Sequence, residues 1–308
     1  TVDNLVITSS SQQALDLLPK VLINPGDKVI VGLPSYLGGL SSFHNYGAKM
    51  IGVEFDDHGM RSDKLEEELE ILRKVDEKPK FIYIIPDFQN PAGITMPESR
   101  RKEIIAIAEK YDVLIVEDSP YRELRFEGEH QRTIHQLANN GKVILLGTFS
   151  KIFVPGFRIG WIIGDELIID KLVMSKQSTD LCTSSFVQKI AAKYMEKGYF
   201  EKNLIKIIDL YKGKKDVMME AFETYLPEGV TWTNPDGGLF LFVTLPEHMD
   251  AEDLFKVAVE NDVAFVIGSA FHCDESGKNT MRMNFSFASK EEITEGVERL
   301  AKAIKEMM

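Results

Sequence analysis

The sequence predicts an α/β fold, in which helices sandwich a mainly parallel sheet and a smaller C-terminal α+β domain follows. Two observations support this prediction. Up to about residue 200, short runs rich in Val, Ile and Leu alternate with helical patterns, which is typical of βαβ units covered on both faces. After residue 200, a long helical stretch precedes strands that have fewer helices between them. We therefore predict a large domain at 1–200 and a small domain at 201–308.

The large domain is predicted to alternate strands and helices from its first residues. Its strands are apolar runs without alternation, as expected for strands buried on both faces. They are Lys28–Val31, Lys49–Glu54, Phe81–Ile85, Val113–Glu117, Val143–Leu146 and Ile159–Ile163. The helical patterns between several of them are Gln12–Ile23, Ser62–Lys74, Pro97–Tyr111 and Thr133–Asn139. Ligands of such folds bind beyond the carboxyl ends of the strands, so the residues directly after each strand are the candidates for a site.

The small domain is predicted to open with a long helix at Tyr199–Tyr225. The strands expected after it are Val230–Thr233, Leu239–Leu245, Val263–Ile267 and Met281–Phe287. Helices at Ala251–Asn261 and Lys290–Met308 separate or end these strands. In the last strand, Met281, Met283, Phe285 and Phe287 share one face, while Arg282 lies on the other.

Composition excludes several classes of function. The chain of 308 residues has a formal net charge of −12, which argues against broad binding to nucleic acid or to anionic membranes. Its two cysteines, Cys182 and Cys273, lie far apart and indicate neither a disulfide framework nor a metal site. The sequence contains no apolar stretch long enough for a membrane span and no signal peptide. A cytoplasmic protein is therefore expected.

Lys151 is the strongest candidate for a reactive group. It stands in the stretch GTFSKIFVPGFRIGW, beside Ser150 and seven residues before Arg158, directly after the strand Val143–Leu146. A solvent-exposed lysine at a helix start is the simpler interpretation. At a strand end, however, burial and neighbouring cations would lower the pKa of the amine and keep it nucleophilic.

Polar residues also follow two neighbouring strands. In DVLIVEDSPYREL, Asp118 ends an apolar strand and Tyr121 comes three residues later. A buried carboxylate needs a cationic partner, such as a protonated ring nitrogen, although Asp118 would also serve as a cap of the next turn. In FIYIIPDFQNPAG, Pro91 restricts Asn90 to extended backbone, and Asn is also common in ordinary turns.

Two further motifs are weaker when each is taken alone. In ITSSSQQALD, serines precede a helix, where they suit capping but also the binding of an anion at Ser11 and Gln12. In VGLPSYLGG, Tyr36 lies in a turn, where its ring either packs on a flat ligand or is simply a surface aromatic. Together the candidates supply an anion cradle, an aromatic ring, an amide, a carboxylate and an amine, which are the groups that pyridoxal 5′-phosphate requires.

The whole chain resembles the class I/II aminotransferases, which belong to the fold-type-I group of pyridoxal-phosphate enzymes. Within this family it is most similar to the 2-aminoadipate/kynurenine aminotransferase-like branch. The motifs that carry the resemblance appear in family order: SSSQQALD, PSYLGG, IPDFQNPAG, VEDSPYREL, GTFSKIFVPGFRIGW, NPDGGLFLFV and MRMNFSF. One departure is Ala92, where the family has Thr within Asn-Pro-Thr-Gly.

The resemblance implies a role for each matching residue. Lys151 would bind the cofactor covalently and shuttle a proton during catalysis. Asp118 would pair with the ring nitrogen, while Asn90 and Tyr121 would hydrogen-bond the phenolic oxygen. The ring of Tyr36 would stack on the cofactor ring. The phosphate would be bound by Ser11, Gln12, Ser150 and Arg158. The α-carboxylate of the substrate would be bound by Arg282 with Asn90.

The implied function is amino-group transfer from an amino acid to a 2-oxo acid, with 2-oxoglutarate as the expected acceptor, by a ping-pong mechanism in a homodimer with shared active sites. Two alternatives stay open: a pyridoxal-phosphate carbon–sulfur β-lyase, and the sensor domain of a transcription regulator. Family members carry a segment before the phosphate-binding helix that covers the substrate. The sequence starts without Met at TVDNLVITSSS, so we expect this segment to be absent from it.

Overall fold

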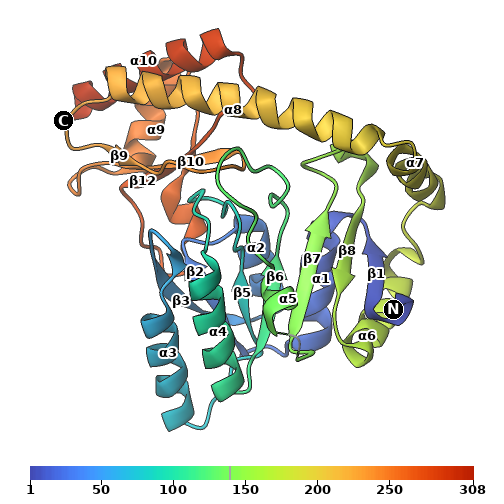
Figure 1. The fold of residues 1–308 in the computed structure, drawn as a ribbon. Helices are drawn as coiled ribbons and strands as arrows, with labels where there is room; N and C mark the ends of the chain where they lie inside the picture. Colours follow the sequence, from blue (N-terminus) through green and yellow to red (C-terminus); the bar gives the residue numbers. More distant parts are fainter. Residues whose placement is uncertain (139) are drawn as a thin grey trace.

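A large sheet of eight strands forms the centre of the computed structural model, which describes residues 1–138 and 140–308 (Figure 1). Five neighbouring strands, β7, β6, β5, β2 and β3, run parallel, and the strands at both sides pair antiparallel. Across the sheet the order is β1 (Leu5–Thr8), β8 (Gly160–Ile163), β7 (Val143–Thr148), β6 (Leu114–Asp118), β5 (Phe81–Ile84), β2 (Lys28–Leu33), β3 (Lys49–Asp56) and β4 (Gly59–Met60). The predicted mainly parallel sheet is confirmed.

Helices cover both faces of this sheet because successive strand residues point to opposite sides. On β5, Phe81 and Tyr83 pack in a core with α1, α2 and α6, whereas Ile82 and Ile84 pack in a second core with α3, α4 and α5. These helices are α1 (Ser10–Leu22), α2 (Leu37–Asn45), α3 (Ser62–Lys74), α4 (Glu98–Lys110), α5 (Ile134–Ala138) and α6 (Glu166–Asp180). The long continuous apolar strands are thus explained by burial on both sides.

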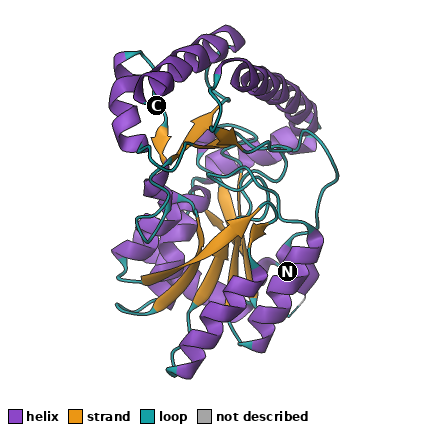
Figure 2. Cartoon of the chain, turned by 90° about the vertical axis from the view of Figure 1, so that its left-hand side faces the viewer, coloured by secondary structure: helices purple, strands orange, loops and turns teal. Residues whose placement is uncertain are grey.

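A second, antiparallel sheet of four strands lies beyond the end of the large sheet (Figure 2). Its order is β11 (Val266–Ile267), β12 (Thr280–Asn284), β10 (Phe240–Thr244) and β9 (Thr231–Trp232). The helices α8 (Tyr199–Tyr225), α9 (Ala251–Glu260) and α10 (Lys290–Met307) contribute to its apolar core. In Figure 1 the 27-residue α8 runs from α7 (Ser185–Glu196) across to this small sheet. The domain boundary near residue 200 stays a prediction.

Several predicted elements needed correction. The helices α2, α6 and α7 were missed. In the small sheet, β11 is shorter than predicted and β12 ends at Asn284, so Phe287 lies outside the strand and is 96% exposed. Short strands beside loops carry too few apolar residues to define their ends by pattern. The predicted end of one helix, Asn139, lies outside the described residues.

The described residues also form three short 3₁₀ helices: η1 (Val2–Asn4), η2 (Pro155–Phe157) and η3 (Gly268–Phe271). The turn η2 follows Lys151 and precedes Arg158. The turn η3 contacts the loop that follows β2 of the large sheet. The carbonyl oxygen of Phe271 accepts a hydrogen bond from the backbone N–H of Ser35, 2.7 Å away. Within the part of the chain that the structure describes, no helix is both long and apolar enough to cross a membrane.

Candidate active site

Lys151 lies in the turn that follows β7, at the carboxyl end of the parallel strands. Its side chain is partly buried, and burial lowers the pKa of its amine. The nearby positive charges of Arg158 and Arg282 lower that pKa further, while the carboxylate of Asp118 opposes the shift. The environment thus raises the fraction of neutral amine, which is the nucleophilic form of lysine.

A cluster of hydroxyl groups lies beside this lysine. The Oγ of Ser10 is 3.1 Å from Oγ1 of Thr148 and 2.9 Å from Oγ of Ser150, and Arg158 donates from Nη1 to Ser150 Oγ at 3.2 Å. The start of α1 reaches this cluster because β8 has Gly160 here: a Cβ at that position would lie 2.6 Å from the carbonyl carbon of Ser10. Hydroxyls, a guanidinium and the amino end of a helix together suit a phosphate group.

The sequence pointed to the right helix but not to all of its polar residues. Ser11 lies in the first turn of α1, whereas Ser10 and Thr148, which the motif did not single out, form the hydroxyl cluster with Ser150. The side chain of Gln12 turns toward α2, where its Oε1 accepts a hydrogen bond from the hydroxyl of Tyr36 at 3.1 Å. Gln12 therefore holds the ring of Tyr36 at the edge of the site.

Asp118 ends β6 and is fully buried. Its Oδ2 accepts a hydrogen bond of 2.9 Å from the hydroxyl of Tyr83, but its Oδ1 has no hydrogen-bond partner among residues 1–138 and 140–308. Burial raises the pKa of Asp118 to about 7, against the opposing effects of the Tyr83 hydroxyl and the Lys151 charge. A buried carboxylate oxygen left open in this way is suited to a cationic group of a ligand.

The preceding residue, Glu117, serves the fold instead. Its carboxylate accepts hydrogen bonds from the backbone N–H groups of Ile134 (3.0 Å) and His135 (2.9 Å), at the start of α5. Burial raises the pKa of Glu117 to about 7 as well. Because both of its oxygens are used by backbone donors, Glu117 has the role of a helix cap and Asp118 alone points to a ligand.

Asn90 connects the two sheets. Its Nδ2 donates to the hydroxyl of Tyr121 at 3.3 Å, and its Oδ1 accepts from Nη1 of Arg282 at 2.9 Å. The guanidinium of Arg282 lies over the rings of Phe240 and Phe271, 4.2 and 5.1 Å from their centres. Burial raises the pKa of Tyr121 and lowers that of Arg282. Arg282 lies on the strand face that the sequence predicts for it, and its side chain points to Asn90 and the site.

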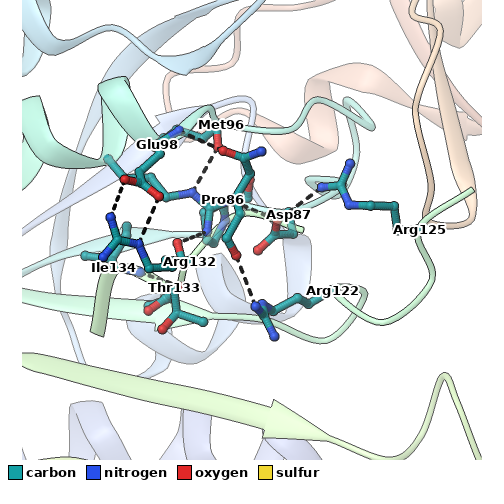
Figure 3. Close-up of polar contacts among 12 residues, drawn as sticks. Pro86, Asp87, Met96, Glu98, Arg122, Arg125, Arg132, Thr133 and Ile134 are labelled. Carbon is teal, nitrogen blue, oxygen red and sulfur yellow. Dashed lines mark hydrogen bonds and ion pairs between the residues drawn. The ribbon is translucent and has the colours of Figure 1, made fainter. Parts of the chain in front are cut away.

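A buried ion pair holds the loop that carries Asn90. Arg101, on α4, donates from Nη2 to Oδ1 of Asp87 at 2.7 Å, and the side chains are 0% and 1% exposed. The same guanidinium donates to the carbonyl oxygens of Met96 (2.9 Å) and Pro86 (3.3 Å) at the two ends of the loop. Figure 3 shows Asp87 next to Pro86, with the guanidinium of Arg125 on its other side; Nη2 of Arg125 is 3.7 Å from Oδ1 of Asp87. Sequence reasoning missed Arg101, because it lies in a helix fourteen residues after Asp87.

The predicted residues therefore converge at one edge of the large sheet. The charge of Asp118 acts on Tyr36, Tyr83, Tyr121 and Lys151, which belong to four different segments. Arg282 reaches the same place from the small sheet, because its charge acts on Lys151 and Tyr36. An amine, an open carboxylate oxygen, an amide and two guanidinium groups thus surround one position.

Comparison with known proteins agrees with this geometry. The family model for aminotransferase class I and II matches residues 1–300. The chain belongs to this family. The aromatic-amino-acid aminotransferase 1 of Thermococcus litoralis is 50% identical over 305 residues, which cover 99% of this chain and 73% of that protein. The 2-aminoadipate transaminase of Thermus thermophilus is 36% identical, over 99% of this chain and 76% of its own length.

Solved structures of the family superpose closely on this aminotransferase. The kynurenine aminotransferase of Pyrococcus horikoshii, solved with PMP, kynurenine and its product, matches with a TM-score of 0.97 at 49% identity. The match covers 99% of this chain and 75% of that one. The chain thus spans about three quarters of the length of these relatives. The predicted resemblance and the fold-type-I architecture are confirmed.

The residues of this aminotransferase fit the cofactor of its family, pyridoxal 5′-phosphate. The open Oδ1 of Asp118 suits a protonated ring nitrogen. The hydroxyl cluster with Arg158 suits the phosphate. The amine of Lys151, with its lowered pKa, suits the aldehyde. The chain is a pyridoxal-phosphate-dependent enzyme that transfers amino groups between amino acids and oxo acids.

Proposed function

We propose that the site works with Lys151 as the catalytic amine and Asp118 as the anchor of the cofactor ring. The observation that carries this proposal is the pairing of a lysine whose pKa is lowered with a buried carboxylate that has one oxygen without a partner. When bound, pyridoxal phosphate supplies a reactive carbonyl and an electron-withdrawing ring. The chain has to hold that ring, orient the substrate and move protons.

Holding the cofactor involves residues from five segments. The carboxylate of Asp118 binds the ring nitrogen and keeps it protonated. The Nδ2 of Asn90 and the hydroxyl of Tyr121 bind the phenolic oxygen, and the ring of Tyr36 packs on the cofactor. The phosphate is bound by the start of α1 at Ser11 and Gln12, by Ser150 and by Arg158.

Orienting the substrate falls to Arg282. Its Nη1 is fixed by Asn90 Oδ1, and its Nε has no hydrogen-bond partner among the described residues. A planar guanidinium with free donors binds a carboxylate through two parallel hydrogen bonds. The α-hydrogen of the amino acid would then face Lys151, whose neutral amine removes the proton. In the second half-reaction the amino group replaces the oxo oxygen of the acceptor, which leaves as water, and the same amine would return a proton to that α-carbon, which completes a ping-pong cycle.

Replacing Lys151 by Ala tests the central claim. We expect turnover to fall on the order of 10⁴-fold, because the general base is lost, while circular dichroism shows an intact fold. Borohydride reduction of the wild-type holoenzyme, followed by peptide mapping, should attach the cofactor to the peptide that contains Lys151. The matched control is Lys171→Ala, an exposed lysine on α6. A label on another lysine, or full turnover of Lys151→Ala, would contradict the proposal.

The substrates and the assembly are also proposals. We propose 2-oxoglutarate as the amino acceptor and a cytoplasmic homodimer with shared active sites as the working form. The donors to test first are aromatic amino acids, 2-aminoadipate and kynurenine, for which the relatives are named. Coupled assays of these donors with 2-oxoglutarate should give glutamate. If a cysteine thioether is instead split into a thiol, pyruvate and ammonia without any acceptor, the activity is that of the carbon–sulfur β-lyase.

A further inference from the structure

The two oxygens of Asp118 have different surroundings. Oδ2 accepts a hydrogen bond of 2.9 Å from the hydroxyl of Tyr83, whereas Oδ1 is buried without a hydrogen-bond partner in the described part of the chain. A carboxylate without such a donor would be free to rotate and exchange its oxygens. The hydrogen bond to Tyr83 therefore fixes the orientation of the carboxylate and with it the direction in which its other oxygen points.

Tyr83 is itself held from both sides. It lies on β5, next to β6 in the sheet, and is fully buried. Its ring packs edge-on against Phe43 of α2, with centres 5.2 Å apart and planes at 78°. Gly39, also on α2, makes room for it: a Cβ at Gly39 would lie 3.1 to 3.3 Å from atoms of the Tyr83 ring and hydroxyl. The hydroxyl thus has one defined position.

We propose that Tyr83 is a positioning residue for the cofactor, because its hydroxyl fixes Oδ2 of Asp118 and thereby directs Oδ1 to the ring nitrogen of pyridoxal phosphate. This inference rests on the proposed role of Asp118. In this proposal Tyr83 acts only through the carboxylate, to which its hydroxyl donates.

The hydrogen bond also favours the charged form of the carboxylate. The groups that face Asp118 are Tyr83 on β5, Lys151 after β7, Tyr36 before α2 and Tyr121 after β6. Tyr83 and Lys151 both lower the pKa of Asp118, against burial. Without the Tyr83 hydroxyl, that pKa rises further. The carboxylate would then lose its charge at a higher pH and bind a protonated ring nitrogen less well.

The experiment is a titration of the apo-protein with pyridoxal phosphate, followed by absorbance, between pH 5.5 and 9. The variants are Tyr83→Phe, Asp118→Asn and the double variant. We expect Tyr83→Phe to weaken binding about tenfold or more, the loss typical of a buried hydrogen bond to a charged group. The loss of affinity on lowering the pH should also begin at a higher pH than in wild type. Thermal melting checks that Tyr83→Phe is folded.

The double variant separates an effect through Asp118 from any other. If Tyr83 acts through the carboxylate, Tyr83→Phe should weaken binding little further once Asp118→Asn is present. The matched control is Tyr46→Phe, which removes a hydroxyl that donates to another carboxylate, Asp16, at 3.2 Å. This control should bind the cofactor like wild type.

Each outcome decides between distinct claims. If Asp118→Asn binds the cofactor as tightly as wild type, the proposed role of Asp118 is wrong and the inference on Tyr83 falls with it. If Asp118→Asn binds weakly but Tyr83→Phe binds like wild type, only the inference on Tyr83 is overturned. Additive losses in the double variant would overturn it as well, since Tyr83 would then act independently of Asp118.

Discussion

Two pairs of buried charges near the end of the large sheet differ in whether an oppositely charged partner lies at hydrogen-bond distance within the described residues. Arg101 uses Nε, Nη1 and Nη2 in hydrogen bonds to Met96, Arg132, Pro86 and Asp87. Arg282 makes one hydrogen bond, to Asn90, and its Nε has no partner within the described residues. Among the carboxylates, Asp87 has a guanidinium at 2.7 Å, whereas the one side chain of residues 1–138 and 140–308 at hydrogen-bond distance from the Asp118 carboxylate is the neutral hydroxyl of Tyr83.

This difference distinguishes charges that build the fold from charges that bind a ligand. Burying an ion is costly unless a partner compensates it. Asp87 in the loop and Arg101 on α4 compensate each other's charge, so their interaction stabilises the folded apo-protein. Among the described residues, Asp118 and Arg282 have no oppositely charged partner at hydrogen-bond distance, so we expect the cofactor and the substrate to compensate their charges.

The largest effect is expected from breaking the internal pair. Replacing Arg101 by Met leaves Asp87 as a buried charge without its hydrogen-bonded partner, so we expect a loss of about 3–5 kcal/mol in the free energy of unfolding. Urea denaturation of the apo-protein measures this loss. The control is Arg299→Met, which removes an exposed pair with Asp262 and should leave stability close to wild type. Equal stability of both variants would show that the buried pair does not hold the fold.

Removing the charge of Asp118 should raise the free energy of unfolding of the apo-protein at neutral pH, whereas the Arg101 substitution lowers it. The pKa of Asp118 is about 7 in the folded apo-protein and near 3.8 in an unfolded chain. The folded state therefore binds the extra proton between pH 4 and 7, and the stability that Asp118 contributes below this range is lost as the pH rises. In Asp118→Asn the free energy of unfolding should fall less from pH 5 to pH 7.5, by on the order of 2 kcal/mol.

Urea denaturation of both apo-proteins at the two pH values measures this difference. Some dependence on pH should remain in the variant, because the pKa of Glu117 is raised in the same direction. If Asp118→Asn destabilises the apo-protein at pH 7.5, Asp118 behaves like a charge that stabilises the fold, and its distinction from Asp87 is wrong. Together with weaker cofactor binding, a gain in apo-stability would mark Asp118 as a ligand-binding charge.

Much of the site could be predicted because its residues directly follow strands. The end of an apolar run shows where a parallel strand stops, and Asp118 and Lys151 stand at or just after such ends. Family order then added Arg282, for which the alternating pattern predicts a strand face but no role. The convergence of these residues follows from the topology of the sheet.

The residues that support the site could not be predicted in the same way. Tyr83 lies inside β5, where an aromatic side chain indicates only a buried core position. Arg101 lies in a helix and pairs with a loop that the sequence does not place beside it. Ser10 and Thr148 meet across 138 residues of chain. Each of these contacts depends on packing between distant segments, which no local spacing encodes.

The smallest effect is expected at the aromatic rings that hold Arg282. The ring of Phe271 lies 5.1 Å from its guanidinium carbon, and Phe271 also links η3 to Ser35, next to Tyr36. Replacing Phe271 by Leu removes a cation–π contact worth about 1 kcal/mol. Because the contact orients the group proposed to bind the carboxylate, KM should rise about fivefold for both amino acid and oxo acid, while kcat changes little.

Steady-state kinetics with one donor and one acceptor measure this division between KM and kcat. The control is Phe255→Leu, whose ring packs against Phe265 in the small domain, with centres 5.4 Å apart. It should change neither constant. A fall in kcat at unchanged KM in Phe271→Leu would place the ring closer to the proton transfer than to carboxylate binding.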